Sequence, residues 1–229
     1  GTAQMGVFAL PVTVLWIVGI VNAVNLIDGL DGLAGGVVFF AALTNFIVAR
    51  ISGNVFVDAL MACMLGAVLG FLFFNFNPAR IFMGDSGSYF LGFVLAAAAI
   101  SVGREQKTST TVSILVPIIA LGVPIFDTLF AMVRRFLERR PLFSPDRSHI
   151  HHRLVDLGMT QRRAVLVLYA ASIAMAVAAI VAALGRDWQV GFAILAASVV
   201  MVGLVRSVGA FHELHLRRRQ RERIRSHNA

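Results

Sequence analysis

The sequence predicts an all-α, polytopic integral membrane protein, a bundle of about seven transmembrane helices, from three observations. Hydrophobic residues make up 58% of the 229 residues and charged residues only 14%, against about 25% charged residues in an average soluble domain. The mean hydropathy is +0.82. The apolar residues fall into seven long runs without the alternation typical of strands.

Each run is close to the roughly 20 residues that a bilayer-spanning helix needs. Lipid offers no partners to backbone groups, so these runs are expected to be helical. The fifth run contains Pro117 and Pro124, which predict a kinked or broken helix. In order, the runs lie at 6–24, 32–48, 55–74, 88–102, 112–130, 164–184 and 190–205.

The connections between seven crossings alternate between two faces of the membrane. One face receives 25–31, 75–87, 134–163 and the tail, which together carry 15 of the 20 Lys and Arg residues, whereas the opposite face carries 4. The positive-inside rule then places the first face in the cytoplasm. This rule, with attraction to anionic lipid, explains the basic tail better than nucleic-acid binding does. The same counting brings every unusual polar cluster of the sequence to one face.

The first cluster is NAVNLIDGLDGLAGG, in which Asn22, Asn25, Asp28 and Asp31 recur every three residues. Residues at this spacing share one face of a helix. Carboxylates and amides that converge at a helix end are hard oxygen ligands suited to Mg²⁺. The alternative is a Gly-Asp turn that caps the next helix, but two Asp and two Asn in phase favour the ligand site.

The second cluster is FNFNPARIFMGDSGSYFLG, where Pro78 and Gly84 bracket a short loop before Asp85. The start of a helix presents free backbone N–H groups and a positive dipole end, which suit phosphate. Asp85 could be a simple N-cap. A cap needs only one such residue, so three small polar residues and two glycines favour an Mg²⁺ ligand beside a phosphate cradle.

The third cluster is FSPDRSHIHHRL, with three His and two Arg residues inside seven positions. Arginine binds phosphate through paired hydrogen bonds, so phosphate-substrate binding is the favoured interpretation. The alternatives are a solvated basic loop and a zinc site, although no Cys lies nearby. The candidate residues are Arg147, His149, His151, His152 and Arg153.

These motifs, in this order between residues 22 and 154, resemble the polyprenyl-phosphate N-acetylhexosamine-1-phosphate transferase superfamily (glycosyltransferase family 4). The similarity is greatest to its undecaprenyl-phosphate N-acetylglucosamine-1-phosphate transferase branch. The resemblance implies transfer of a sugar 1-phosphate from a UDP-N-acetylhexosamine to undecaprenyl phosphate, with release of UMP. It implies Mg²⁺, with Mn²⁺ as an alternative, and a cytoplasmic active site in the bacterial inner membrane. Membrane lipid is a further expected partner, and a homodimer is left open.

The resemblance also implies roles for single residues. Catalytic roles are expected for Asp28, Asp31, Asp85 and His151, and metal ligation for Asp85 and Asn25. Substrate binding is expected for Asn22, Gly84, Arg147, His149, His152 and Arg153.

The chain departs from the family in one respect. The family carries an Asp-Asp-x-x-Asp motif and further helices before the region that matches, and this chain has no adjacent Asp pair. We therefore expect the carboxy-terminal part of an enzyme, inactive or nearly so in isolation. Its expected organisation is a transmembrane catalytic domain at 1–210 and a basic cytoplasmic tail at 211–229.

Two other functions compete with this interpretation. A phospho-N-acetylmuramoyl-pentapeptide transferase of peptidoglycan synthesis would carry three consecutive histidines, whereas Ile150 interrupts them here. A transporter could use Asp28 and Asp127 as ion sites, but the polar residues gather at one face rather than near mid-membrane. Asp127 itself is left open between catalysis and a structural ion pair with Arg134 or Arg135.

Overall fold

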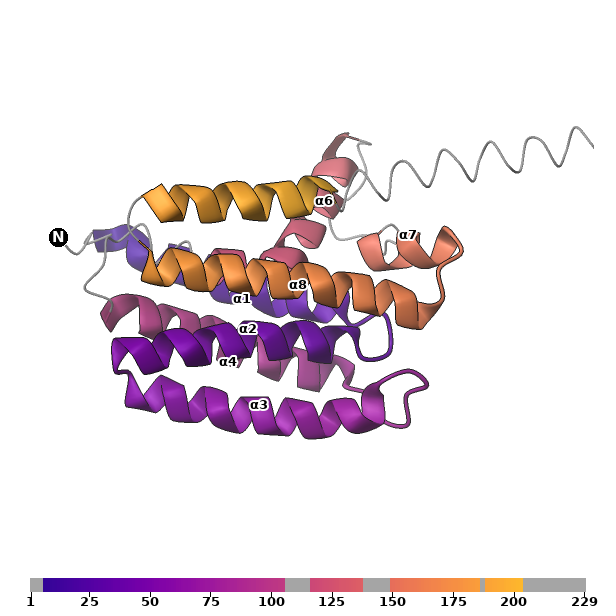
Figure 1. Cartoon of the computed structure of the whole chain (residues 1–229), viewed down its shortest axis with the longest axis horizontal. Coiled ribbons are helices and arrows are strands. Elements are labelled where there is room, and N and C mark those ends of the chain that lie inside the picture. The colour runs from indigo at the N-terminus through magenta and orange to yellow at the C-terminus, as the bar shows by residue number, and fades with distance from the viewer. Residues whose placement is uncertain (1–5, 106–115, 138–148, 186–187, 204–229) are drawn as a thin grey trace, which may run out of the picture.

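A computed structural model shows that the regular secondary structure of the described residues is entirely helical (Figure 1). The structure describes residues 6–105, 116–137, 149–185 and 188–203. In chain order the elements are η1 (Gly6–Phe8), α1 (Ala9–Ile27), α2 (Leu33–Ser52), α3 (Val55–Asn75), α4 (Gly84–Glu105), α6 (Gly122–Leu137), α7 (Ile150–Asp156), α8 (Gln161–Leu184) and the helix Trp188–Gly203.

Within the described residues, five helices are long and apolar enough to cross a membrane, and they coincide with five of the seven predicted runs. These spans are Gly6–Ile27, Leu33–Ser52, Val55–Asn75, Gly84–Val102 and Gln161–Leu184. The run at 190–205 corresponds to the shorter apolar helix Trp188–Gly203. The predicted class, an all-α polytopic membrane protein, is confirmed.

The fifth run is broken, as its prolines predict. A turn at Leu121 separates the helical residues 116–120 from α6. Pro124 has no N–H to donate to the carbonyl four residues earlier, and its ring crowds that carbonyl. The Leu121 and Ile125 amides still donate to the carbonyls of Pro117 and Leu121, at 3.0 and 3.1 Å. After this break α6 runs obliquely to the long helices (Figure 1).

Helix α2 forms the centre of the bundle and packs against α3, α4 and α8. Its inner face is built largely of small residues, which let neighbouring backbones approach closely. A Cβ added to Gly36 would lie 2.0 Å from Cζ of Tyr169, so the Tyr169 ring occupies the space where that side chain would be. The outer helices instead expose large apolar side chains, such as Leu15 on α1 and Phe73 on α3, which suits contact with lipid.

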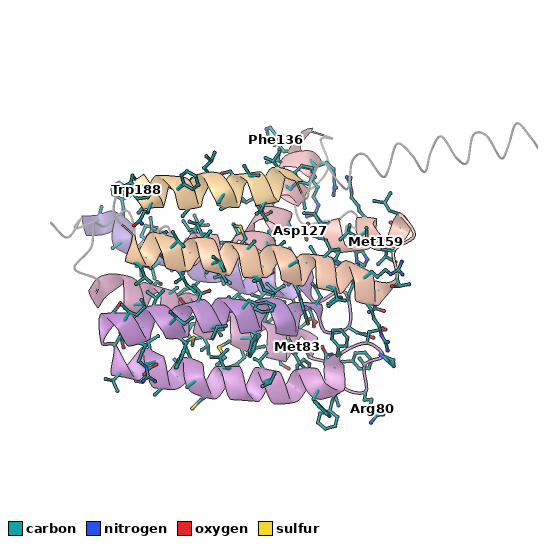
Figure 2. The ribbon with its side chains drawn as sticks, viewed as in Figure 1. Arg80, Met83, Asp127, Phe136, Met159 and Trp188 are labelled. Carbon is teal, nitrogen blue, oxygen red and sulfur yellow. The ribbon has the colours of Figure 1, made fainter. Side chains whose placement is uncertain are left out.

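The connections that carry the polar clusters lie at one end of the bundle, called the site end below. Loop 28–32, loop 76–83, helix α7 and the turn into α8 all lie there, and the turn between α2 and α3 lies at the other end (Figure 1). Figure 2 shows Arg80 and Met159 at the site end and Trp188 at the opposite end. The described residues of the three clusters thus lie at one end of the bundle, as predicted, whereas residues 143–148 of the third cluster are outside the described residues. The cytoplasmic orientation of that face stays a prediction.

Candidate active site

The first and second clusters meet through Asn25 and Asp85. Nδ2 of Asn25, in the last part of α1, donates to Oδ1 of Asp85 at 3.1 Å and to Oγ of Ser88 at 2.9 Å. Ser88 is completely buried, and its hydroxyl donates to the Asp85 carbonyl at 3.1 Å. Asp85 lies in the first turn of α4, which begins at Gly84, so it is not the residue preceding the helix that an N-cap requires. Because the Asn25 nitrogen makes both bonds, its amide oxygen is the atom available to a cation.

The sequence predicted that the four polar residues spaced three apart share one helix face. This expectation is only partly correct, because helix α1 ends at Ile27. Asn22 and Asn25 lie on α1, Asp28 is its C-cap, and Asp31 lies in the following turn. Gly32 has a φ of 80°, a left-handed conformation that glycine adopts without strain. The chain therefore leaves the helix inside the motif, and Asp28 and Asp31 take up different environments.

Asp28 lies close enough to Asp85 for their charges to interact. Partial burial raises the pKa of the Asp28 carboxyl above its ordinary value, and the negative charge of Asp85 raises it further. Two carboxylates that repel each other in this way favour a proton or a cation between them. Together with the Asn25 amide oxygen they form a cluster of hard oxygen donors.

Asp31 and Asn75 bind loop 28–32 to loop 76–83. Oδ2 of Asp31 accepts from Nδ2 of Asn77 at 3.0 Å and from the Ala79 amide at 3.1 Å. Asn75 accepts from the Gly32 amide at 2.9 Å and donates to the Ile81 carbonyl at 2.8 Å. Asp31 thus has a visible structural role, and its catalytic role stays a prediction.

The start of α8 holds the same two loops. Nδ2 of Asn77 also donates to Oε1 of Gln161 at 2.9 Å, and Nε of Arg162 donates to the Asn77 carbonyl at 2.9 Å. The Tyr169 hydroxyl donates to the Gly32 carbonyl. Asn75, Asn77 and Tyr169 are not among the site residues that the sequence predicts. The repeated Asn in FNFNPAR, next to the Asp85 motif, was the signal that could have pointed to the first two.

The third cluster reaches loop 28–32 through His151. The His151 side chain is 1% exposed, and neither ring nitrogen has a hydrogen-bond partner. A Cβ added to Gly29 would lie 2.3 Å from Nε2 of His151, so the imidazole rests directly on that glycine. Burial, and then the neighbouring His152, lower the pKa of His151 to about 4, with Asp127 acting in the opposite direction and His149 adding to the decrease. The imidazole is therefore neutral near pH 7.

Asp127 fixes the start of α7. Its Oδ2 accepts from Nδ1 of His149 at 3.1 Å, and its Oδ1 accepts from the Ile150 amide at 2.9 Å. All three groups are buried. The structure therefore gives Asp127 partners that neither sequence alternative had named.

The remaining predicted residues are placed as follows. Asn22 is exposed and donates to the Val18 carbonyl of its own helix at 2.8 Å. Gly84 begins α4 with a φ of 64°. His152 and Arg153 are half-buried on α7. Arg147 and the tail 211–229 lie outside the described residues. The substrate-binding roles of these residues stay predictions.

The oxygen donors at Asn25, Asp28 and Asp85 are of the type that hard divalent cations prefer. In the part of the chain that the structure describes, no group of three or more His, Cys, Asp or Glu side chains is arranged to hold a metal ion. Mg²⁺ is usually held by one or two carboxylates, with waters and substrate phosphates completing its shell. Structural zinc requires four close ligands, and His149, His151 and His152 do not supply them.

Comparisons with known proteins agree with these motifs. Residues 1–103 match the family model described as glycosyl transferase family 4. The chain is 45% identical over 210 residues to a probable undecaprenyl-phosphate N-acetylglucosaminyl 1-phosphate transferase of Bacillus subtilis, covering 92% of this chain and 58% of that protein. It is 42% identical over 115 residues to a decaprenyl-phosphate N-acetylglucosaminephosphotransferase of Mycobacterium tuberculosis, covering 46% of this chain and 28% of the relative.

A third relative belongs to the competing branch. The chain is 37% identical over 156 residues to a phospho-N-acetylmuramoyl-pentapeptide-transferase of Streptococcus pyogenes, covering 68% of this chain and 46% of the relative. The chain thus spans at most 58% of the length of these three relatives. The three convergent motifs and the helical membrane fold agree with the match of residues 1–103 to glycosyl transferase family 4 and with these relatives.

Proposed function

We propose that the chain contributes the active-site end of an enzyme that transfers N-acetylhexosamine 1-phosphate, in the first place GlcNAc-1-phosphate, from a UDP-sugar to undecaprenyl phosphate. UMP is the second product. The observation that carries the proposal is the contact of Asn25 with Asp85, beside Asp28, at the same end of the bundle where His151 rests on Gly29.

The reaction joins two anionic partners. An oxygen of the acceptor phosphate forms a bond to the sugar-bearing phosphorus, and the bond from that phosphorus to the bridging oxygen of UMP breaks. Because both reactants are negatively charged, catalysis depends mainly on positioning and on neutralisation of charge. A bound divalent cation would act as a Lewis acid and offset the charge of both phosphates.

The chain's own residues prepare this site. Asp28 and Asp85 would hold the cation through carboxylate oxygens, and Asn25 orients Asp85 by the bond that it donates. Neutral His151, whose ring is buried against Gly29, would support loop 28–32 from within beside Asp28. Arg153, on the same short helix, would supply positive charge to phosphate. We place this end at the cytoplasmic face of the bacterial inner membrane, as the distribution of Lys and Arg favours.

UMP release tests the proposal. The native enzyme is assayed in membranes of the cells that produce it, with undecaprenyl phosphate as the acceptor. The donor is varied over a panel of UDP-sugars, and each assay is run with and without Mg²⁺. We expect Mg²⁺-dependent release with UDP-GlcNAc and a loss of about 10²-fold or more for Asp85→Asn, since a single preorganised electrostatic group contributes that much. Asp58→Asn is the matched control, because Asp58 lies at the start of α3 and pairs with Arg50.

Two outcomes contradict the proposal in different ways. If the wild-type enzyme prefers the muramoyl-pentapeptide donor, the assignment of the donor is wrong. If it releases no UMP from any UDP-sugar, or if Asp85→Asn is as active as Asp58→Asn, the proposed reaction itself is wrong.

A further inference from the structure

Asp127 is a buried acid whose contacts the proposed reaction does not use. It is 5% exposed and lies on α6, but both of its carboxylate oxygens bond to the start of α7. One contact is to the His149 ring and the other to the Ile150 backbone amide. A carboxylate only accepts hydrogen bonds, so the contact fixes the His149 tautomer with its proton on Nδ1.

These two contacts matter because α7 is short. It contains 7 residues, far fewer than the roughly 12 to 15 that an isolated helix needs to be even marginally stable in water. A carboxylate that accepts from a first-turn amide satisfies an orphan donor and favours the positive end of the helix dipole. The two contacts with Asp127 therefore help to fix the position and direction of α7, which also packs against α8.

The residue that follows Ile150 is His151. Its ring is stacked against His149, with ring centroids 5.7 Å apart, and lies 4.2 Å from the centroid of His152. On the other side it rests on Gly29, where a Cβ would lie 2.3 Å from Nε2. The imidazole is thus held between the Asp127 side of α7 and the loop that carries Asp28.

The fold delivers Asp127 to this position through the break in the fifth run. The turn at Leu121 redirects the chain into α6. Gly122 then packs so closely against α8 that an added Cβ would lie 2.1 Å from Cε of Met175. One turn further along α6, Asp127 faces α7 (Figure 2 labels it).

We infer that Asp127 is a positioning residue for the proposed transferase reaction: by capping α7 and bonding to His149, it seats His151 on Gly29 beside the carboxylates of the site. This inference rests on the proposed function. A purely structural buried pair would instead stabilise the protein without affecting the rate of the folded enzyme.

The test uses Asp127→Asn, which keeps the shape of the side chain and one acceptor oxygen but removes the carboxylate. We expect kcat to fall by about 10- to 100-fold, because a misplacement of about 1 Å at an active site costs up to 10²-fold, while KM for the UDP-sugar changes much less. Asp58→Asn, which removes an acid from the Arg50 pair at the other end of the bundle, serves as the control and should leave kcat unchanged.

Two measurements need no enzymatic activity. Hydrogen exchange should become faster in the peptide that contains the Ile150 amide. Labelling of His151 by diethyl pyrocarbonate, read by fragment mass spectrometry, should rise from the protection that its burial confers. If Asp127→Asn yields no folded protein, His149→Gln removes only the imidazole contact and is measured in the same way.

The outcomes separate this inference from the proposed function. A wild-type enzyme without UMP release contradicts the proposed function, whereas exchange and labelling still report whether Asp127 holds α7. If the wild type is active and folded Asp127→Asn has a normal kcat, Asp127 does not position His151. The same follows if hydrogen exchange and His151 labelling are unchanged in Asp127→Asn.

Discussion

The link between loops 28–32 and 76–83 can be tested by Asn75→Ala. Asn75 is 4% exposed, and its amide satisfies the buried Gly32 N–H and the partly buried Ile81 carbonyl. An orphaned buried backbone group costs about 1–3 kcal/mol, and a partly buried carbonyl that water can reach costs less. We therefore expect a loss of about 2–4 kcal/mol in the free energy of unfolding.

Thermal unfolding of the purified protein in detergent measures this loss. For a chain of this size it corresponds to a decrease in Tm of about 4–16 °C. Asn22→Ala is the matched control, because Asn22 is exposed and bonds only to its own helix, so the expected change is within about 0.5 kcal/mol. If the two variants have the same Tm, Asn75 does not hold the two loops together.

Two further predictions concern packing and pH. Gly36→Ala should destabilise the protein by about 1–3 kcal/mol, because the new Cβ would collide with the Tyr169 ring; Gly66→Ala, with open space around it, should be neutral or slightly stabilising, and equal Tm values would refute the collision. His151 has a folded pKa of about 4 against an ordinary value of 6.5, so only the unfolded state gains its proton between these values. This proton uptake costs no stability above pH 6.5, and it lowers the free energy of unfolding by on the order of 3 kcal/mol as the pH drops to 4. Unfolding measurements over this pH range should show the slope in the wild type and a weaker slope in His151→Asn. Parallel pH profiles of the two proteins would contradict the prediction.

The sequence by itself determined the membrane class, the position of five spans and the break in the fifth run. Hydropathy depends on the composition of each run, and proline's missing N–H acts on its own backbone, so both effects are local. Counting crossings also brought the clusters around Asp28, Asp85 and His151 to one end, because each span reverses the side of the membrane on which the chain emerges. That argument needs only the number of spans between two motifs.

Other features were decided by tertiary contacts. The sequence spaced Asn25, Asp28 and Asp31 as one helical face, but the helix ends at Ile27, and Asp31 bonds to loop 76–83. Asp127 was ambiguous because its partner, His149, lies 22 residues further along the chain.

The physical reason is the range of the interactions involved. Hydropathy and proline act within one segment, so they can be read from the residues themselves. A buried hydrogen bond such as that from Ile150 to Asp127, or the seat of His151 on Gly29, exists only where packing brings distant segments within about 3 Å of each other. The residue types indicated the kind of chemistry that the chain can support. The packing of α6, α7 and loop 28–32 decided which side chains come together in the candidate site.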